Sequence, residues 1–108
     1  MEKERKIFEK IANQLVLSGV NVSHGKMMSS PAIKYKTKVF TFYDKKEMVF
    51  KLGKDFDPKT HNLQHTRVLS PFKNKIPLSG WLVVSSNESN RWEELAYIAL
   101  EKLKKQLN

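Results

Sequence analysis

The chain has 108 residues, no cysteine and a formal charge of +9, from 20 Lys and Arg against 11 Asp and Glu. This length fits a single domain over residues 1–108, and an apolar share of 40% is ordinary for a globular protein. The absence of cysteine excludes a disulfide framework, a thiol nucleophile and a thiolate metal site. The charged first residues and the short apolar runs predict a cytoplasmic protein without a secretory signal or membrane span.

The positive charge is carried mostly by lysine. A basic surface attracts polyanions, of which nucleic acid is the commonest in the cytosol, although lysine-rich surfaces also keep proteins soluble. Arginine is the residue that reads bases and holds phosphate in a bidentate manner, and the chain has only Arg5, Arg67 and Arg91. We therefore expect any nucleic-acid binding to be weak and independent of sequence.

The N-terminal segment predicts a helix over about residues 3–17. Ile7, Phe8, Ile11 and Leu15 recur at helical spacing and form one apolar stripe. Gly19 is placed to end this helix, and a loop that contains Ser23, His24 and Gly25 is expected to follow.

The hydrophobic period changes towards two between residues 26 and 52, which predicts an antiparallel meander. The first strand, residues 27–35, is interrupted by Pro31, which favours an edge position or a bulge. The second, residues 38–43, has two apolar faces, so both are expected to be covered. The third spans residues 48–52, and the turns fall at residues 36–37 and 44–47.

The remainder predicts less regular structure, then a strand and a helix. Asp57 and Pro58 are typical of the start of a short helix, expected over residues 58–64, and residues 66–78 are expected to be rich in loops. Residues 81–85 predict a further strand. Asn90 and Glu93 form a candidate capping box for a helix that ends near residue 106.

These elements predict an α+β fold, in which an antiparallel four- to five-stranded sheet packs against the N- and C-terminal helices. The side chains expected in its core are Ile7, Ile11, Leu15, Phe40, Phe42, Phe50, Trp81, Val83, Leu95, Ala99 and Leu103.

Several segments together carry a resemblance to a known family. They are residues 25–28 (GKMM), 30–34 (SPAIK), 38–40 (KVF), 49–52 (VFKL), 76–84 and the helix that contains Trp92. In these the chain resembles the TfoX N-terminal domain family, which is Sxy-like and belongs with the wider YjbR-like group, although Met28-Ser29 stands where many members have Phe-Gly. The resemblance implies a prokaryotic, cytosolic regulatory domain with an antiparallel sheet between terminal helices, and it supplies no catalytic or ligand residues.

Two histidines have the spacing of a helical zinc site. His61 and His65 would share one face of a helix, but Asn62 stands where a metalloprotease has its glutamate, and no third ligand is evident. We therefore predict no metal site and no cofactor.

Other catalytic patterns are weak. Residues 19–26 depart from a phosphate-binding loop because the spacing is too long and Met27 replaces the hydroxyl residue. Ser23 and Lys26 have the spacing of some acyl-transfer enzymes without the supporting motifs. We predict no catalytic residues and a protein that is not an enzyme.

The densest basic stretch lies between residues 34 and 54. It suggests two alternatives, a polyanion-binding surface or a lysine-protected sheet edge that prevents aggregation. The lysines concerned are Lys34, Lys36, Lys38, Lys45, Lys46, Lys51 and Lys54.

Tyr97 and Ile98 lie off the main apolar stripe of the final helix. Such a pair is covered by the 53–80 segment, buried in a homodimer or simply exposed, so the chain is expected to be a monomer or a homodimer.

The sequence thus favours a non-catalytic regulatory or interaction domain that acts through contacts with an unidentified protein partner. Weak, sequence-independent nucleic-acid binding through lysine-rich hairpins is the alternative, and a small-molecule or metal-dependent enzyme ranks third.

Overall fold

A computed structural model describes residues 3–27, 29–69 and 78–107. In chain order the elements are α1 (Lys3–Ser18), β1 (Val22–Met27), β2 (Ser30–Tyr35), β3 (Lys38–Asp44), β4 (Glu47–Lys51), the 3₁₀ turn η1 (Pro58–His61), β5 (Thr66–Leu69), β6 (Leu78–Val84), the 3₁₀ segment η2 (Ser86–Arg91) and α2 (Trp92–Leu107).

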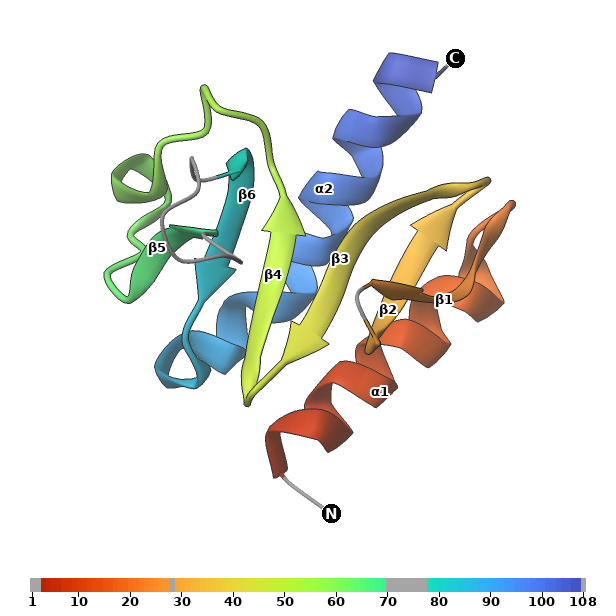
Figure 1. The fold of residues 1–108 in the computed structure, drawn as a ribbon, viewed down its shortest axis with the longest axis horizontal. Coiled ribbons are helices and arrows are strands. Elements are labelled where there is room, and N and C mark those ends of the chain that lie inside the picture. Colours follow the sequence, from red (N-terminus) through yellow and green to blue (C-terminus); the bar gives the residue numbers. More distant parts are fainter. Residues whose placement is uncertain (1–2, 28, 70–77, 108) are drawn as a thin grey trace.

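The strands form one six-stranded antiparallel sheet in the order β1-β2-β3-β4-β6-β5. Buried residues of α1 and α2 belong to the same hydrophobic cluster, so both helices pack on one face of the sheet (Figure 1). The predicted α+β class with terminal helices on an antiparallel sheet is confirmed. Neither helix of the described residues is long and apolar enough to cross a membrane.

The sheet is larger than expected because two edge strands had weak sequence signals. β1 includes Ser23, His24 and Gly25, which were expected to lie in a loop. Its residues alternate between more and less buried positions, as in a strand with one face towards the core. β5 forms in a segment expected to be rich in loops. β2 is consequently an inner strand, so the edge position expected from Pro31 is wrong.

A bulge between β2 and β3 separates two aromatic side chains. Ile33 pairs with Thr41 but Lys34 pairs with Val39, so Phe40 is the extra residue. In a regular strand Phe40 and Phe42 would share a face, whereas here they belong to clusters on opposite faces. The bulge therefore lies within the sheet at Phe40, rather than at Pro31.

The helix-covered face carries the main core, and the opposite face carries a smaller apolar cluster. That smaller cluster contains Ala32, Phe42, Val49 and Val83, with Met27, Val39 and Trp81 packed against it. Of the predicted core residues only Ile7 and Trp81 remain half-buried, and the others are buried. Trp81 stays partly accessible because it lies at the margin of the smaller cluster.

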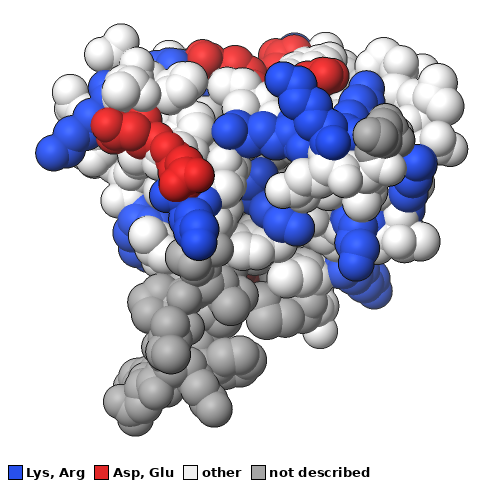
Figure 2. All heavy atoms as spheres, turned by 90° about the horizontal axis from the view of Figure 1, so that it is seen from above, with Lys and Arg blue, Asp and Glu red and all other residues white. Residues whose placement is uncertain are grey.

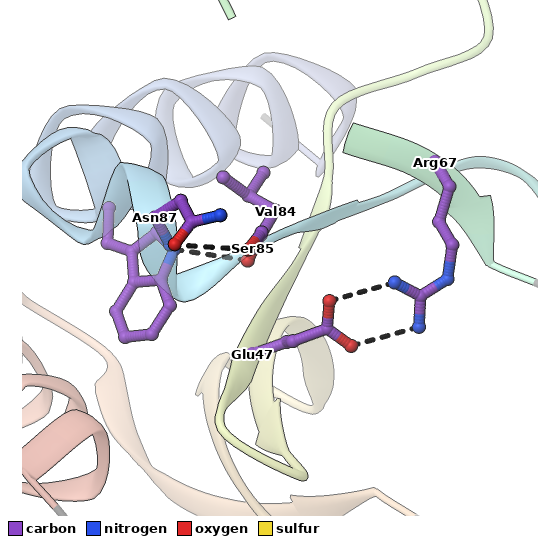
Figure 3. A network of polar contacts seen from close by, with 6 residues as sticks. Glu47, Arg67, Val84, Ser85 and Asn87 are labelled. Carbon is purple, nitrogen blue, oxygen red and sulfur yellow. Dashed lines mark hydrogen bonds and ion pairs between the residues drawn. The ribbon is translucent and has the colours of Figure 1, made fainter. Parts of the chain in front are cut away.

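Polar contacts connect β6 to α2 and β4 to the edge strand β5. The buried Trp92 indole donates a hydrogen bond to the Val84 carbonyl (3.2 Å). Arg67 of β5 and Glu47 of β4 point toward each other and form a bidentate ion pair, in which the two terminal guanidinium nitrogens lie 2.8 and 2.9 Å from the carboxylate oxygens (Figure 3). This ion pair bridges over β6 on the face without helices, since Arg67 is paired with Val83 of that face.

The last helix begins differently from the prediction. Ser85 caps η2 by accepting a hydrogen bond from the Asn87 backbone N–H, so helical backbone starts before the expected capping box at Asn90. α2 then follows from Trp92 and buries its apolar stripe against the sheet.

Candidate anion-binding surface

The antiparallel topology divides the lysine-rich stretch between two ends of the sheet. Lys36 lies in the turn between β2 and β3, where Tyr35 pairs with Lys38. Lys45 and Lys46 lie in the turn between β3 and β4, at the opposite end of β3. The sequence alone grouped these lysines, and the structure separates them (Figure 1).

The C-terminal end of α2 lies at the same end of the sheet as Lys36. The Tyr35 ring links the two, because the Nζ of Lys36 lies 5.5 Å from the ring centroid and the Nζ of Lys104 lies 6.0 Å from it. Each ammonium is within the range of a cation–π contact. Residues more than sixty positions apart in sequence thus bring their charges together.

We call this lysine-rich end of the molecule the basic end. Figure 2 looks onto it and shows several Lys and Arg side chains there, with acidic side chains along the upper edge of the view and among the basic side chains on the left. Asp55 and Glu101 reduce its charge, and Glu101 lies 3.6 Å from Lys104. The lysines of the basic end are Lys36, Lys38, Lys51, Lys54, Lys102, Lys104 and Lys105.

A hollow of about 410 Å³ opens within the basic end. Three segments line it, namely residues 51–55, Gly80 with Trp81, and the end of α2 through Lys102, Leu103, Lys105 and Gln106. We call it the Trp81 hollow. A smaller hollow of about 150 Å³ adjoins it and shares Gly53, Lys54, Gly80 and Trp81.

Two glycines let the chain turn at the wall of the Trp81 hollow. Gly53 and Gly80 have φ values of +88° and +96°, which residues with a side chain rarely adopt. The Gly80 carbonyl accepts hydrogen bonds from the backbone N–H groups of Leu52 (2.9 Å) and Gly53 (3.1 Å). These bonds hold the end of β4 against β6, and Lys51 and Lys54 flank the junction.

The arginines of the chain lie in ion pairs with glutamates. Arg5 pairs with Glu9 at 3.6 Å and Arg67 with Glu47 at 2.8 Å, while Arg91 pairs with Glu94. The hydrogen bond to Glu47 raises the pKa of Arg67 above its ordinary value.

The ion pair between Arg91 and Glu94 shifts the pKa of both residues. The hydrogen bond to Glu94 raises the pKa of Arg91. The same bond lowers the pKa of the Glu94 carboxyl, against a smaller opposing effect of burial. The guanidinium groups of Arg67 and Arg91 are thus ion-paired with Glu47 and Glu94.

The two histidines do not share a helical face. η1 ends at His61 and Asn62 takes a left-handed conformation, so the helix expected over residues 58–64 is shorter than predicted and His65 lies outside it. The His61 ring stacks on Phe56 with 4.5 Å between centroids, whereas the His65 backbone N–H donates to Glu88. No three acidic or histidine side chains of the described residues group as metal ligands.

The other weak motifs lie on extended backbone. Ser23 and Lys26 both belong to β1, where residues three apart point to opposite faces. The candidate phosphate loop over residues 19–26 is therefore for the most part a β-strand, whose geometry does not cradle a phosphate.

The lysines also fail to protect a sheet edge. The edges are β1 and β5, whereas Lys34, Lys38 and Lys51 belong to the inner strands β2, β3 and β4. The stem of Lys34 lies across Gly25 of β1, where an added Cβ would come within 3.2 Å of the lysine Cδ. Edge protection does not account for this group.

Tyr97 and Ile98 have different surroundings. Ile98 packs against the main core cluster, whereas Tyr97 is 40% exposed. The pair therefore does not form one continuous apolar surface.

Sequence reasoning missed four residues of the basic end. Lys102, Lys104 and Lys105 were not among the lysines singled out by the sequence, and Trp81 was expected in the core. No local signal joins them to Lys36 or Lys54, because their proximity depends on the strand order.

No family model, curated protein or solved structure matches the chain. The TfoX N-terminal resemblance therefore stays a prediction, and the functional proposal depends on the geometry of the basic end.

Proposed function

We propose that this chain is a non-catalytic interaction domain of the TfoX N-terminal type that binds the phosphate backbone of nucleic acid through its basic end. One observation carries the proposal, which is that lysines from the β2–β3 turn, the β4–η1 segment and α2 gather on one end of the molecule. Ammonium groups held together raise the local positive potential and attract phosphates.

The expected binding does not read base sequence. Arginine forms the commonest specific base contacts, and Arg5, Arg67 and Arg91 lie in ion pairs with glutamates. Lysine acts as a flexible point charge that suits the backbone. Affinity in the range of about 10⁻⁴ to 10⁻⁶ M at physiological salt is typical of such binding.

The sequence favoured a protein partner, and the same charges would attract an acidic protein. The gathering of lysines favours nucleic acid because a phosphate backbone presents a denser and more regular row of charges than most protein surfaces. The experiment therefore compares the two kinds of polyanion.

Fluorescence anisotropy with a labelled DNA duplex, and with a labelled polyglutamate of similar charge, tests the proposal at low salt. Two double variants carry the same loss of charge, Lys36→Gln/Lys38→Gln at the basic end and Lys45→Gln/Lys46→Gln at the opposite end. We expect the first to weaken duplex binding several-fold and the second to leave it nearly unchanged. Equal losses in both variants, or tighter binding of polyglutamate than of DNA, would contradict the proposal.

A further inference from the structure

The outer edge of β1 is long and regular. β1 is the outermost strand on its side, and among the described residues no strand lies beyond it. Its six residues pair with β2 without a shift of register. β5, at the other edge, has four residues and pairs irregularly with β6 between Val68 and Leu69. Short length and bulges are what make an edge a poor template for a further strand, so β1 is the better template of the two.

The hydrogen bonds of the β1–β2 hairpin show which backbone groups of β1 point outwards. The Lys36 N–H donates to the Asn21 carbonyl (2.8 Å), and the register makes these two residues a hydrogen-bonded pair. Bonded and non-bonded pairs alternate along antiparallel strands. Pro31, which has no N–H, therefore lies at a non-bonded position and interrupts no bond between β1 and β2. The residues of β1 whose backbone N–H and C=O groups point away from β2 are Val22, His24 and Lys26.

The hairpin that carries this edge is basic on both faces. The sequence has no Asp or Glu over residues 10–43. His24 and Lys26 are exposed, and they point to the same side because residues two apart in a strand share a face. On the other face the stem of Lys34 lies across Gly25. Cationic side chains thus flank the outward-pointing backbone groups on either side.

Two exposed apolar side chains lie beside the start of β1. Leu17 and Val20 are 88% and 78% exposed, the highest values among the large apolar residues that the structure describes. The turn that holds them packs closely on the strand, because a Cβ at Gly19 would come within 2.6 Å of the Val22 side chain. They offer apolar contact at one end of the edge, where a bound chain would cover them.

We infer that an extended, acidic segment of a partner protein adds a strand to the sheet along β1. Main-chain hydrogen bonds to Val22, His24 and Lys26 hold it, and its carboxylates face the cations of the hairpin. A second copy of this chain suits the edge poorly, because each copy carries a charge of +9. The inference does not rest on the proposed function, because it depends on the backbone of β1 and not on the binding of duplex by the basic end.

A short peptide of alternating glutamate and valine is the probe, and hydrogen exchange of the amides in ¹⁵N-labelled protein is the measurement. At about ten times its Kd, the peptide should slow exchange of the outward-pointing amides about tenfold, since exchange then occurs mainly from unbound protein. The alternate amides of β1, which already donate to β2, should change less. No saturable binding, an equal change along the whole of β1 or protection confined to β5 would overturn the inference. Protection of the outward-pointing amides by higher protein concentration alone would also overturn it, in favour of a second copy.

Methylation of the peptide backbone separates strand pairing from attraction between charges. A peptide with the same side chains and methylated backbone nitrogens keeps its carboxylates and valines but cannot donate hydrogen bonds to β1. We expect its affinity to be about tenfold lower or less, because several main-chain bonds are lost. Equal affinity of the two peptides would overturn the inference, and this comparison leaves the protein unchanged.

Three variants complete the test. His24→Pro removes an outward-pointing N–H and no bond to β2, so it should weaken peptide binding about tenfold while the fold is kept. Lys26→Glu should weaken binding several-fold, whereas Lys59→Glu, at an exposed position of η1, should leave it nearly unchanged. Full affinity in His24→Pro, or equal effects of the two glutamate variants, would contradict the site. Duplex binding measured in parallel should be unchanged in His24→Pro, and it shows separately whether the proposed function holds.

Discussion

Leu95 offers the sharpest test of how α2 packs on the sheet. Its side chain is fully buried in the cluster that unites both helices and the strands. Leu95→Ala removes the buried apolar atoms and leaves a cavity, which costs about 2–5 kcal/mol. A domain of this size is stabilised by about 5–15 kcal/mol in total, so the variant is expected to lose a large part of its stability.

The same substitution on an exposed position is the matched control. Leu17 lies on α1 and is 88% exposed, so Leu17→Ala should change stability by at most about 0.5 kcal/mol. At about 4–8 °C per kcal/mol, thermal unfolding followed by circular dichroism should place Leu95→Ala at least about 8 °C below the parent. A melting temperature within two or three degrees of the parent, or an equal loss in Leu17→Ala, would refute the packing.

Three further predictions concern individual contacts. Lys45 and Lys46 form a two-residue hairpin turn and have positive φ values of 49° and 67°. Asn and Gly adopt this backbone conformation more readily than Lys, so Lys45→Asn/Lys46→Gly should raise the free energy of unfolding in urea by about 1 kcal/mol. A lower free energy of unfolding would contradict the turn geometry. The Glu88 carboxylate accepts hydrogen bonds from the backbone N–H groups of Gln64 (3.0 Å) and His65 (2.6 Å), just before β5. Glu88→Ala should therefore lower the free energy of unfolding by about 1 kcal/mol and speed hydrogen exchange of these two amides. Unchanged amide exchange would contradict these hydrogen bonds. The lowered pKa of Glu94 beside Arg91 means that the pair stabilises the fold above the unfolded carboxyl pKa and loses this effect as the pH falls through the folded pKa. Because the Glu94 side chain is exposed, Glu94→Gln should reduce the difference in melting temperature between pH 7 and pH 3 only slightly. A larger difference in the variant than in the parent would show that the ion pair does not stabilise the fold at neutral pH.

Sequence patterns predicted the elements that have a strong period. α1, β3, β4 and α2 each repeat apolar residues at helical or strand spacing, and the structure confirms all four. β1 and β5 were not predicted, because β1 is rich in polar residues and β5 has four residues, so neither carries a clear strand period. The bulge at Phe40 was equally hidden, since it depends on how β2 and β3 pair.

The candidate site was less predictable than the fold. The sequence singled out Lys51 and Lys54, which line the Trp81 hollow, but grouped them with Lys45 and Lys46 at the other end of the sheet. Proximity in sequence was a poor guide because each hairpin reverses the chain direction. The lysines of α2 reach the site only because the last helix runs back across the sheet.

The salt dependence of duplex binding tests the central claim most directly. Each phosphate neutralised by a lysine contributes about 0.9 to the slope of log affinity against log salt concentration. We expect the parent to bind two duplexes of unrelated sequence with equal affinity and a steep slope. Lys36→Gln/Lys38→Gln should lower that slope by about 1 to 2, whereas Lys45→Gln/Lys46→Gln should leave it unchanged. Binding that is insensitive to salt, or a slope that Lys36→Gln/Lys38→Gln does not alter, would contradict phosphate binding by the basic end.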